Sequence, residues 1–326
     1  MSELGAVIPF WLYRPDLEAL DVAETADRLG YRTLWIGEMV TFDAFALATA
    51  IGMRTKQIGL RIGPLAVGVR SPVSIALGLS SVARLIGRPV DVALGASSPT
   101  IVTNWHNRPF GKSAARMRET VWALRGILED GRSDFHGEQV QTKGFRLRHA
   151  LPSRNVTIAA FGPMMTKIAA EEADEVVLNI VTPGIVARVR EAIDAHAREA
   201  GVKPPRLAVW VSAAINPGAA SYQQLAAQLV VYLKPPGYGE MFTELGYGEL
   251  VERARAGESY AKLAQDLPAE LLARVCAIGT AEQIADRIAK YHQAGADHVA
   301  IVPSTAEDPA GSAVLTALKE YTLNDR

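Results

Sequence analysis

The 326-residue chain is poor in the features that assign a sequence to a special class of protein. It has one cysteine, Cys276, so no disulfide can form within the chain, and a reducing, cytoplasmic setting is expected. The 34 lysine and arginine residues balance 35 acidic residues, which gives no general attraction to nucleic acid or to an anionic membrane. No apolar run approaches the roughly 18 residues that a membrane helix needs. No basic leader precedes an apolar stretch at the N-terminus, so no signal peptide is expected.

Several chemical motifs are also missing. No G-x-G-x-x-G follows a strand-like run, so the sequence has no dinucleotide-binding fingerprint. The six histidines form no H-x-H or H-x-x-x-H pair, so no metal site is expected. Hydrophobic residues make up 49% and charged residues 21%, the mixture of an ordinary globular protein. In such a chain, Cys276 is expected to be a small buried hydrophobe.

The chain does contain a repeated alternation of helix and strand. Segments 23–38, 167–180 and 288–303 each end an amphipathic helix, cross a short link and enter an apolar run, which is typical of a parallel sheet covered by helices. The predicted strands are Gly5–Phe10, Thr33–Glu38, Ile58–Leu65, Val90–Leu94, Val156–Ala160, Glu175–Ile180, Arg206–Ile215 and His298–Val302. Eight alternations predict the α/β class and one (β/α)8 TIM-barrel domain over residues 1–326.

Two connections are too long for a plain βα unit. Residues 135–149 predict a hairpin, with Val140 opposite Phe145 or Leu147 across Thr-Lys-Gly. Residues 222–274 predict extra helix interrupted at Pro-Pro-Gly-Tyr-Gly. Insertions at the carboxyl-end mouth of a barrel usually determine substrate specificity.

The fifth predicted strand runs into a helix through Phe161-Gly162-Pro163-Met164, with no polar loop between them. A helix that begins at Pro163 or Met164 directs its free N–H groups and its positive dipole end at the barrel mouth, where they can bind phosphate. Gly162 would let a ligand approach the backbone closely. The alternative is a tight βα turn that binds nothing.

The third predicted strand contains Gly63-Pro64, although proline removes a ladder hydrogen bond from a buried strand. We therefore expect a bulge at this point and a cis peptide bond between the two residues. The alternative is that the strand simply ends at Gly63.

Residues 58–99 resemble the luciferase-like monooxygenase superfamily, which includes barrel flavoproteins and deazaflavin enzymes. The matching pieces are Gly63–Ala66, Arg70-Ser71-Pro72, Gly87-Arg88 and Gly95-Ala96-Ser97. Residues 160–174 and the stretch GTAEQIADRIAKYHQAGADHVAIVP extend the likeness over nearly the whole chain. The sequence looks most similar to the branch that uses coenzyme F-420, an 8-hydroxy-5-deazaflavin.

The resemblance implies an oxidoreductase that transfers hydride between F-420 and a small organic substrate, in a protein that is often a homodimer. The residues then expected to contact the cofactor are Gly63, Pro64, Leu65, Ala66, Gly95, Ala96, Ser97, Ala160, Phe161, Gly162, Pro163 and Met164. One alternative is a monooxygenase that uses reduced FMN on the same scaffold. Another is a cofactor-binding protein without turnover.

One departure from the family concerns catalysis. The family's sugar-phosphate dehydrogenases have a catalytic histidine and glutamate at positions that match Met39 and Ser98, neither of which suits proton transfer at neutral pH. Glu38 and His106 remain as acid/base candidates, although Glu38 could instead cap a loop and His106 could be a surface histidine. The candidates for an apolar substrate pocket are Trp11, Met39, Phe42 and Trp105.

Overall fold

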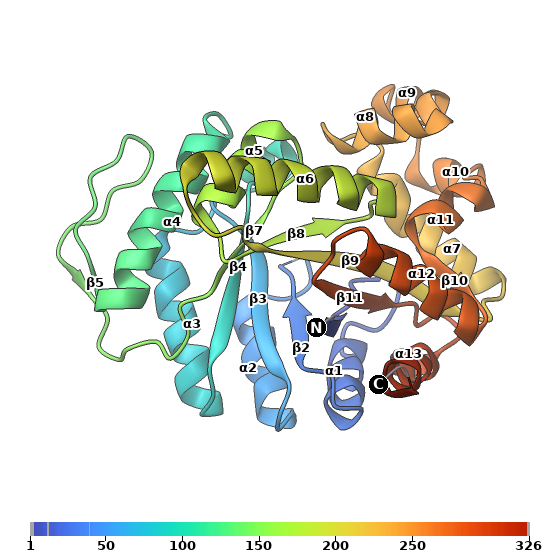
Figure 1. Ribbon diagram of the computed structural model, residues 1–326, viewed down its shortest axis with the longest axis horizontal. Coiled ribbons are helices and arrows are strands. Elements are labelled where there is room, and N and C mark those ends of the chain that lie inside the picture. Colours follow the sequence, from blue (N-terminus) through green and yellow to red (C-terminus); the bar gives the residue numbers. More distant parts are fainter. Residues whose placement is uncertain (1–2, 12, 39, 325–326) are drawn as a thin grey trace.

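The computed structural model describes residues 3–11, 13–38 and 40–324, and within them eight parallel strands close into a barrel (Figure 1). Pairing between β8 and β9 closes the ring, whose order is β9-β11-β1-β2-β3-β4-β7-β8. The barrel strands are β1 (Glu3–Val7), β2 (Thr33–Ile36), β3 (Gly59–Ala66), β4 (Val90–Gly95), β7 (Val156–Ala159), β8 (Glu175–Asn179), β9 (Arg206–Ile215) and β11 (His298–Pro303). The predicted (β/α)8 barrel and all eight of its strands are confirmed.

The helices surround the barrel (Figure 1). Those next to the strands are α1 (Glu18–Arg28), α2 (Ala44–Arg54), α3 (Pro72–Ile86), α4 (Ser113–Asp130), α5 (Pro163–Glu172), α6 (Pro183–Ala200), α7 (Ala219–Leu229), α12 (Ala281–Gln293) and α13 (Ser312–Asn324). Local sequence sets several helix starts: the hydroxyl of Thr280 accepts from the N–H of Gln283 at 3.3 Å, and the Gln283 side chain accepts from the N–H of Thr280 at 2.9 Å. This reciprocal cap is a capping box, which depends only on the local pattern Thr-Ala-Glu-Gln at residues 280–283.

The segment between α4 and β7 contains the short hairpin β5 (Arg132–Ser133) and β6 (Phe145–Arg146), but the predicted pairing of Val140 is wrong. Ser133 pairs with Phe145, and the turn lies at residues 137–140. The reason is tertiary: the Glu119 carboxylate on α4 accepts hydrogen bonds from the N–H groups of residues 138–140. Because the segment leads from a helix into a strand, it lies at the amino end of the barrel, away from the mouth.

The second insertion follows β9 and contains α8 (Tyr238–Phe242), α9 (Gly248–Arg255), α10 (Tyr260–Gln265) and α11 (Ala269–Val275). It also contributes β10 (Ala277–Gly279), which pairs in parallel with the carboxyl end of β9 and which the sequence did not predict. The predicted break at Pro-Pro-Gly-Tyr-Gly is confirmed, because α8 begins at Tyr238, directly after Gly237. This insertion therefore belongs to the mouth.

Candidate functional site

The carboxyl ends of β2, β3 and β4 form one wall of the barrel mouth. The register between β3 and β4 shifts between Ile62 and Leu65, and the Gly63–Pro64 bond is cis, so both the predicted bulge and the predicted cis peptide are confirmed. Gly63 has φ 126°, and a Cβ there would lie 2.1 Å from the carbonyl oxygen of Ala93. Only glycine therefore allows the bulge to lie this close to β4.

Gly95 at the end of β4 continues this wall. A Cβ on Gly95 would lie 3.1 Å from the Cβ of Pro64, so the bulge and the end of β4 are in direct contact. The predicted cofactor residues are thus brought together, with two qualifications. Leu65 is fully buried and Ala160 is 2% exposed, so their side chains face the core and they can offer a ligand only backbone.

The start of α5 adjoins this wall, because α5 follows β7 and β7 pairs with β4. The helix begins at Pro163, its N-cap is Gly162 with φ 93°, and no side chain caps it. A Cβ built on Gly162 meets nothing within 4 Å, so the space in front of the first turn is open. Met164 in that turn is 69% exposed. An uncapped helix start that faces open space is suited to an anionic ligand.

Aromatic residues of the second insertion rest on this turn. The rings of Phe161 and Tyr238 are stacked, with centroids 4.5 Å apart, and Tyr238 meets Tyr232 edge-on at 5.0 Å. The side-chain amide of Asn179, at the end of β8, donates to the Tyr232 hydroxyl at 3.1 Å. Burial raises the pKa of Tyr232. Its hydroxyl therefore stays protonated at neutral pH, with its own hydrogen free for another acceptor.

Glu38 follows β2 and is held in an ion pair. The Arg70 guanidinium donates from Nε to both Glu38 oxygens, at 3.1 and 2.9 Å, and it also binds Asp43. Burial alone would raise the pKa of Asp43, but hydrogen bonds from Arg70 and from two backbone amides lower it. The same pairing raises the pKa of Arg70. Glu38 therefore holds the Arg70 guanidinium in place. Both of its oxygens are occupied by this ion pair, so it is not a free acid or base.

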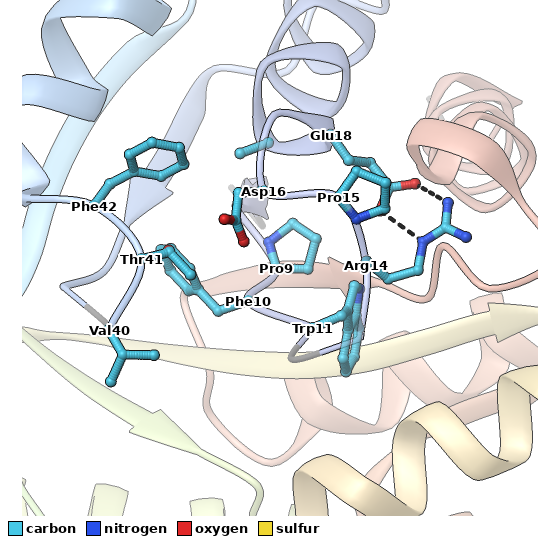
Figure 2. A pocket seen from close by; sticks show the side chains of 11 residues that line it. Pro9, Phe10, Trp11, Arg14, Pro15, Asp16, Glu18, Val40, Thr41 and Phe42 are labelled. Atoms are coloured by element: carbon cyan, nitrogen blue, oxygen red, sulfur yellow. Dashed lines mark hydrogen bonds and ion pairs between the residues drawn. The ribbon is translucent and has the colours of Figure 1, made fainter.

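The remaining predicted substrate residues divide into two groups. Trp11 is buried, and its indole Nε1 donates to the carbonyl oxygen of Pro303 at 3.1 Å. Together with Phe42, it lines a recess between the loops after β1 and β2 (Figure 2). Trp105 is 57% exposed and ends a π-helix, and His106 after it is exposed, with no side-chain hydrogen bond to another described residue. Met39 lies outside the described residues.

Sequence reasoning missed three parts of the mouth. It did not identify Tyr232 and Tyr238, which lie on either side of the Pro-Pro-Gly break, or Trp210 in the middle of β9. Strand alternation could have placed Trp210, because Ala208, Trp210 and Ser212 share one face of β9. Trp210 meets Trp35 of β2 inside the barrel, with ring centroids 5.4 Å apart. The Tyr232–Asn179 contact had no signal in the sequence.

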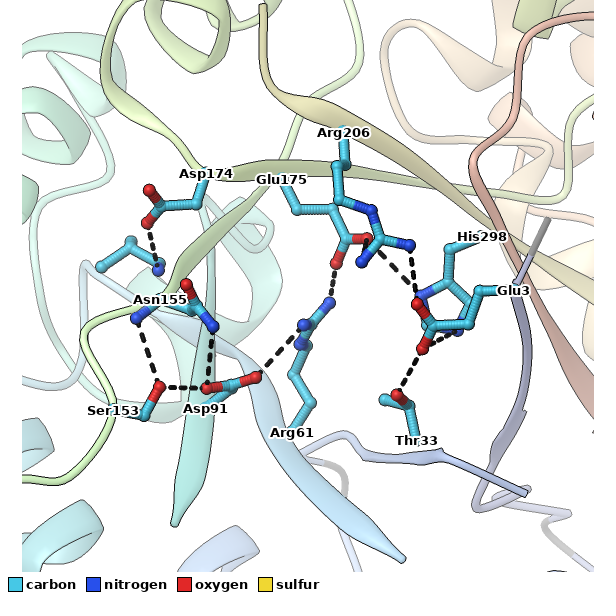
Figure 3. Close-up of polar contacts among 11 residues, drawn as sticks. Glu3, Thr33, Arg61, Asp91, Ser153, Asn155, Asp174, Glu175, Arg206 and His298 are labelled. Carbon is cyan, nitrogen blue, oxygen red and sulfur yellow. Dashed lines mark hydrogen bonds and ion pairs between the residues drawn. The ribbon is translucent and has the colours of Figure 1, made fainter. Parts of the chain in front are cut away.

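The amino end of the barrel contains a second polar group of residues, drawn in Figure 3. We call it the base cluster; its members are Glu3, Arg61, Asp91, Glu175, Arg206 and His298. Arg61 is paired with Glu175 and, at 3.2 Å, with Asp91, and its guanidinium lies 4.6 Å from the Trp35 ring centroid. Because these side chains lie at the amino ends of their strands and below Trp35, they are separated from the mouth.

His298 lies between two carboxylates of the base cluster. Its Nδ1 is 3.5 Å from Glu175, its Nε2 is 3.9 Å from Glu3, and the side chain is fully buried. Burial, opposed by Glu3 and reinforced by the neighbouring arginines, lowers the pKa of His298 to about 3. The imidazole is therefore neutral in the folded protein at pH 7. The burial of Cys276 likewise raises the pKa of its thiol to about 12, as expected for a small buried hydrophobe.

A closed (β/α)8 barrel with a bulged third strand, and with an uncapped helix start facing its mouth, belongs to the class of barrels whose functional sites lie at the carboxyl ends of the strands. The luciferase-like monooxygenase family matches residues 15–298, so the chain belongs to that family and is an oxidoreductase of the luciferase-like class. Among the described residues, no helix is long and apolar enough to cross a membrane, and no three His, Cys, Asp or Glu side chains are grouped to hold a metal.

Two curated relatives are 5,10-methylenetetrahydromethanopterin reductases. The protein from Methanolobus tindarius is 24% identical over 255 residues, which is 76% of each chain. The protein from Archaeoglobus fulgidus is 26% identical over 195 residues, 57% of each chain. Both therefore match along a large part of the barrel.

Solved structures share the fold. The coenzyme F-420-dependent tetrahydromethanopterin reductase from Methanopyrus kandleri has a TM-score of 0.81 at 18% identity, with 98% of each chain covered. An F-420-dependent secondary alcohol dehydrogenase, solved with an F-420–acetone adduct, has a TM-score of 0.80 at 17% identity, with 98% of this chain and 97% of that chain covered. A Baeyer–Villiger monooxygenase from Pseudomonas putida, solved with FMN, has a TM-score of 0.70 at 17% identity, with 98% and 97% covered.

Proposed function

We propose that this protein transfers hydride between coenzyme F-420 and a small organic substrate held at the barrel mouth. The observation that carries the proposal is the start of α5, where uncapped backbone amides face open space on the same side of the mouth as the bulge of β3, one strand beyond β4. The F-420-dependent relatives support the choice of cofactor. When bound, a deazaflavin supplies the hydride chemistry, and the protein supplies orientation and electrostatics.

The residues present suit such a group. The free N–H groups of the first turn of α5 would hold an anionic part of the cofactor, because a helix start attracts negative charge. Gly63, Pro64 and Gly95 would support the ring from the adjoining wall, since the two glycines place no side chain there. Ala66, Ala96 and Ser97 continue the same wall.

We propose Tyr232 as the hydrogen-bond or proton donor to the substrate. It accepts a hydrogen bond from Asn179, so its hydroxyl hydrogen is oriented away from that amide, and burial keeps it protonated. Glu38 would act by positioning Arg70, since both of its oxygens accept from that guanidinium. His106 remains a proposal without a structural partner.

The cofactor is tested by titration of the purified protein with F-420 and, separately, with FMN, followed by fluorescence. We expect saturable binding of F-420 and much weaker binding of FMN. The reverse order would replace the proposal with the reduced-FMN monooxygenase, which the FMN-containing relative makes the main rival. Binding of F-420 without turnover on any substrate panel would support a non-catalytic protein.

The phosphate site is tested at Met164, because Gly162 has φ 93° and any side chain there would strain the backbone. Met164→Glu places a carboxylate beside the helix start and should weaken F-420 binding by roughly five- to tenfold through charge repulsion. It should leave the thermal midpoint unchanged or slightly higher, because an acidic residue stabilises a helix start. Met164→Gln is the neutral control, and equal binding by both variants would place the anion elsewhere.

We further propose a cytoplasmic homodimer formed through α2 and α3. Both helices lie side by side on the outside of the barrel (Figure 1) and expose apolar side chains: Met53 is 74%, Leu77 48% and Leu85 66% exposed. Exposed apolar groups gathered on one face often mark an interface. Light scattering should show a dimer that Leu85→Lys converts to a monomer, and a native monomer would refute the dimer. Cell fractionation tests the location.

A further inference from the structure

The recess between the β1 and β2 loops combines aromatic rings with a carboxylate (Figure 2). Pro9, Phe10, Trp11 and Phe42 provide most of its apolar lining. The indole of Trp11 is fixed by its hydrogen bond to Pro303, so this wall is already ordered without a ligand.

Among the charged groups that line the recess, Asp16 alone makes no side-chain hydrogen bond or ion pair to another described residue. Glu18 is neutralised by Arg14, whose Nε donates to it at 3.0 Å, and it also accepts from the Thr305 hydroxyl at 2.7 Å. Figure 2 shows the Asp16 carboxylate in the recess, with Phe42 on one side and Phe10 and Pro9 on the other. The recess therefore has one uncompensated negative charge next to two aromatic rings.

The recess also adjoins the mouth. A Cβ on Gly37, directly after β2, would lie 3.3 Å from the ring of Phe10 and 3.9 Å from the ring of Trp210. A molecule that reacts above the ends of β2 and β3 can thus extend past Phe10 into the recess. Arg70, on the loop after β3, is already paired with Glu38 and Asp43, so its charge is offset by two carboxylates.

We propose that the recess binds an organic ammonium group on the substrate, next to Asp16 and between Phe10 and Phe42. Aromatic rings attract a cation through the negative charge of their faces, and a carboxylate adds direct attraction. A neutral group of equal shape would gain only the apolar contact, and an anion would be repelled by Asp16. The term substrate rests on the proposed oxidoreductase function, whereas the binding itself does not.

The probes are choline and its uncharged isostere 3,3-dimethylbutan-1-ol, which differ in one charge and hardly in shape. Binding to the full-length protein is followed by calorimetry and by tryptophan fluorescence. We expect choline to bind about fivefold more tightly than the isostere, in line with one cation–π contact and one partly exposed carboxylate. The difference should shrink as salt is added.

Three variants test which side chains cause the preference for choline. Asp16→Asn should remove most of the preference for choline, whereas Asp21→Asn, the same change on the exposed surface of α1, should leave it intact. Phe42→Leu should weaken choline about threefold and the isostere little, because it keeps apolar volume and removes the ring. Thermal midpoints confirm that each variant is folded.

Equal binding of the two probes, absence of choline binding, or a preference that survives Asp16→Asn would overturn the inference. Titration of the same proteins with F-420 separates this result from the cofactor assignment. If choline is preferred but F-420 does not bind, the recess stands and the proposed function fails. If F-420 binds to all variants but choline is not preferred, the recess assignment alone fails.

Discussion

The two ends of this barrel differ in whether their charged and polar groups are paired. At the base, Arg61 and Glu175 are almost fully buried and charged groups meet one another inside the ring of strands. At the mouth, the helix start at Pro163 has no side-chain cap, and Asp16 in the adjoining recess makes no side-chain hydrogen bond or ion pair within the described part of the chain. The comparison teaches that this fold pairs its buried charges with one another, as at Arg61 and Glu175, whereas the exposed Asp16 has no charged partner among the described residues.

The largest expected effect comes from removing a charge of the base cluster. Arg61→Met should lower the free energy of unfolding by about 3–5 kcal/mol, because it leaves Glu175 buried without its cation. Urea unfolding measures the loss. Arg54→Met, which removes an exposed pair with Glu24 at 3.5 Å, is the control and should cost less than about 1 kcal/mol. Equal losses would mean that the base cluster contributes no more than the surface.

The second test uses pH. Burial lowers the folded-state pKa of His298 to about 3, below its usual 6.5, so between these values the unfolded chain binds the proton and the folded protein does not. The resulting stability is present above about pH 6.5 and is lost as pH falls toward 3. We expect the unfolding free energy to decrease by up to about 1.4 kcal/mol per pH unit in this window. Glu3, whose pKa is lowered to about 2, adds to the loss below pH 4.5.

Urea midpoints measured between pH 7.5 and pH 5 check this expectation before most carboxylates titrate. His298→Gln should flatten the profile if the imidazole is the source. A native protein that is equally stable at pH 7.5 and pH 5 would show that His298 binds its proton alike in the folded and unfolded states, and stability that rises toward pH 5 would show that His298 is protonated between Glu3 and Glu175.

At the mouth, the expected effect is on activity. Tyr232→Phe should reduce kcat by about 10²-fold if the hydroxyl is the proton donor, with F-420 affinity nearly unchanged. Steady-state kinetics with any substrate found in a panel gives kcat and KM separately. Tyr222→Phe, an exposed tyrosine on α7, is the matched control. An unchanged kcat would assign Tyr232 to packing against Tyr238 alone.

The smallest effect is expected for the ion pair of the mouth. Arg70→Met should lower the unfolding free energy by only about 1 kcal/mol, because Glu38 and Asp43 remain accessible to water after the change. The same denaturant assay as for Arg61→Met allows a direct comparison of the two arginines. A loss as large as at the base would show that exposure does not explain the difference between the two ends.

The elements of the mouth differed in how far the sequence could predict them. Gly63-Pro64 and Phe161–Met164 could be found because glycine and proline restrict the backbone locally, whatever surrounds them. Glu38 could be placed after β2 but not given a role, because its partner Arg70 lies 32 residues away. The pairing of Val140 failed for a similar reason, since Glu119 on α4 determines that turn.

The base cluster shows the same limit. Glu3, Arg61, Glu175 and His298 come from four strands that are far apart in the sequence, and each looks alone like an ordinary strand-end residue. Closing the barrel brings them together, with His298 between two carboxylates. Chemistry that depends on contacts between distant segments gives no periodic signal.

The sequence by itself determined the alternation of helix and strand, the helix caps and the position of the β3 bulge, because each depends on the residues within a few positions along the chain. Tertiary structure alone decided the surroundings of the ionisable groups: Glu38 gained Arg70, His298 became a buried neutral imidazole, and Asp16 gained no partner among the described residues. The physical reason is that the pKa of a group and the energy of its electrostatic interactions depend on burial and on neighbouring charges. Both are set by how the strands close around the barrel.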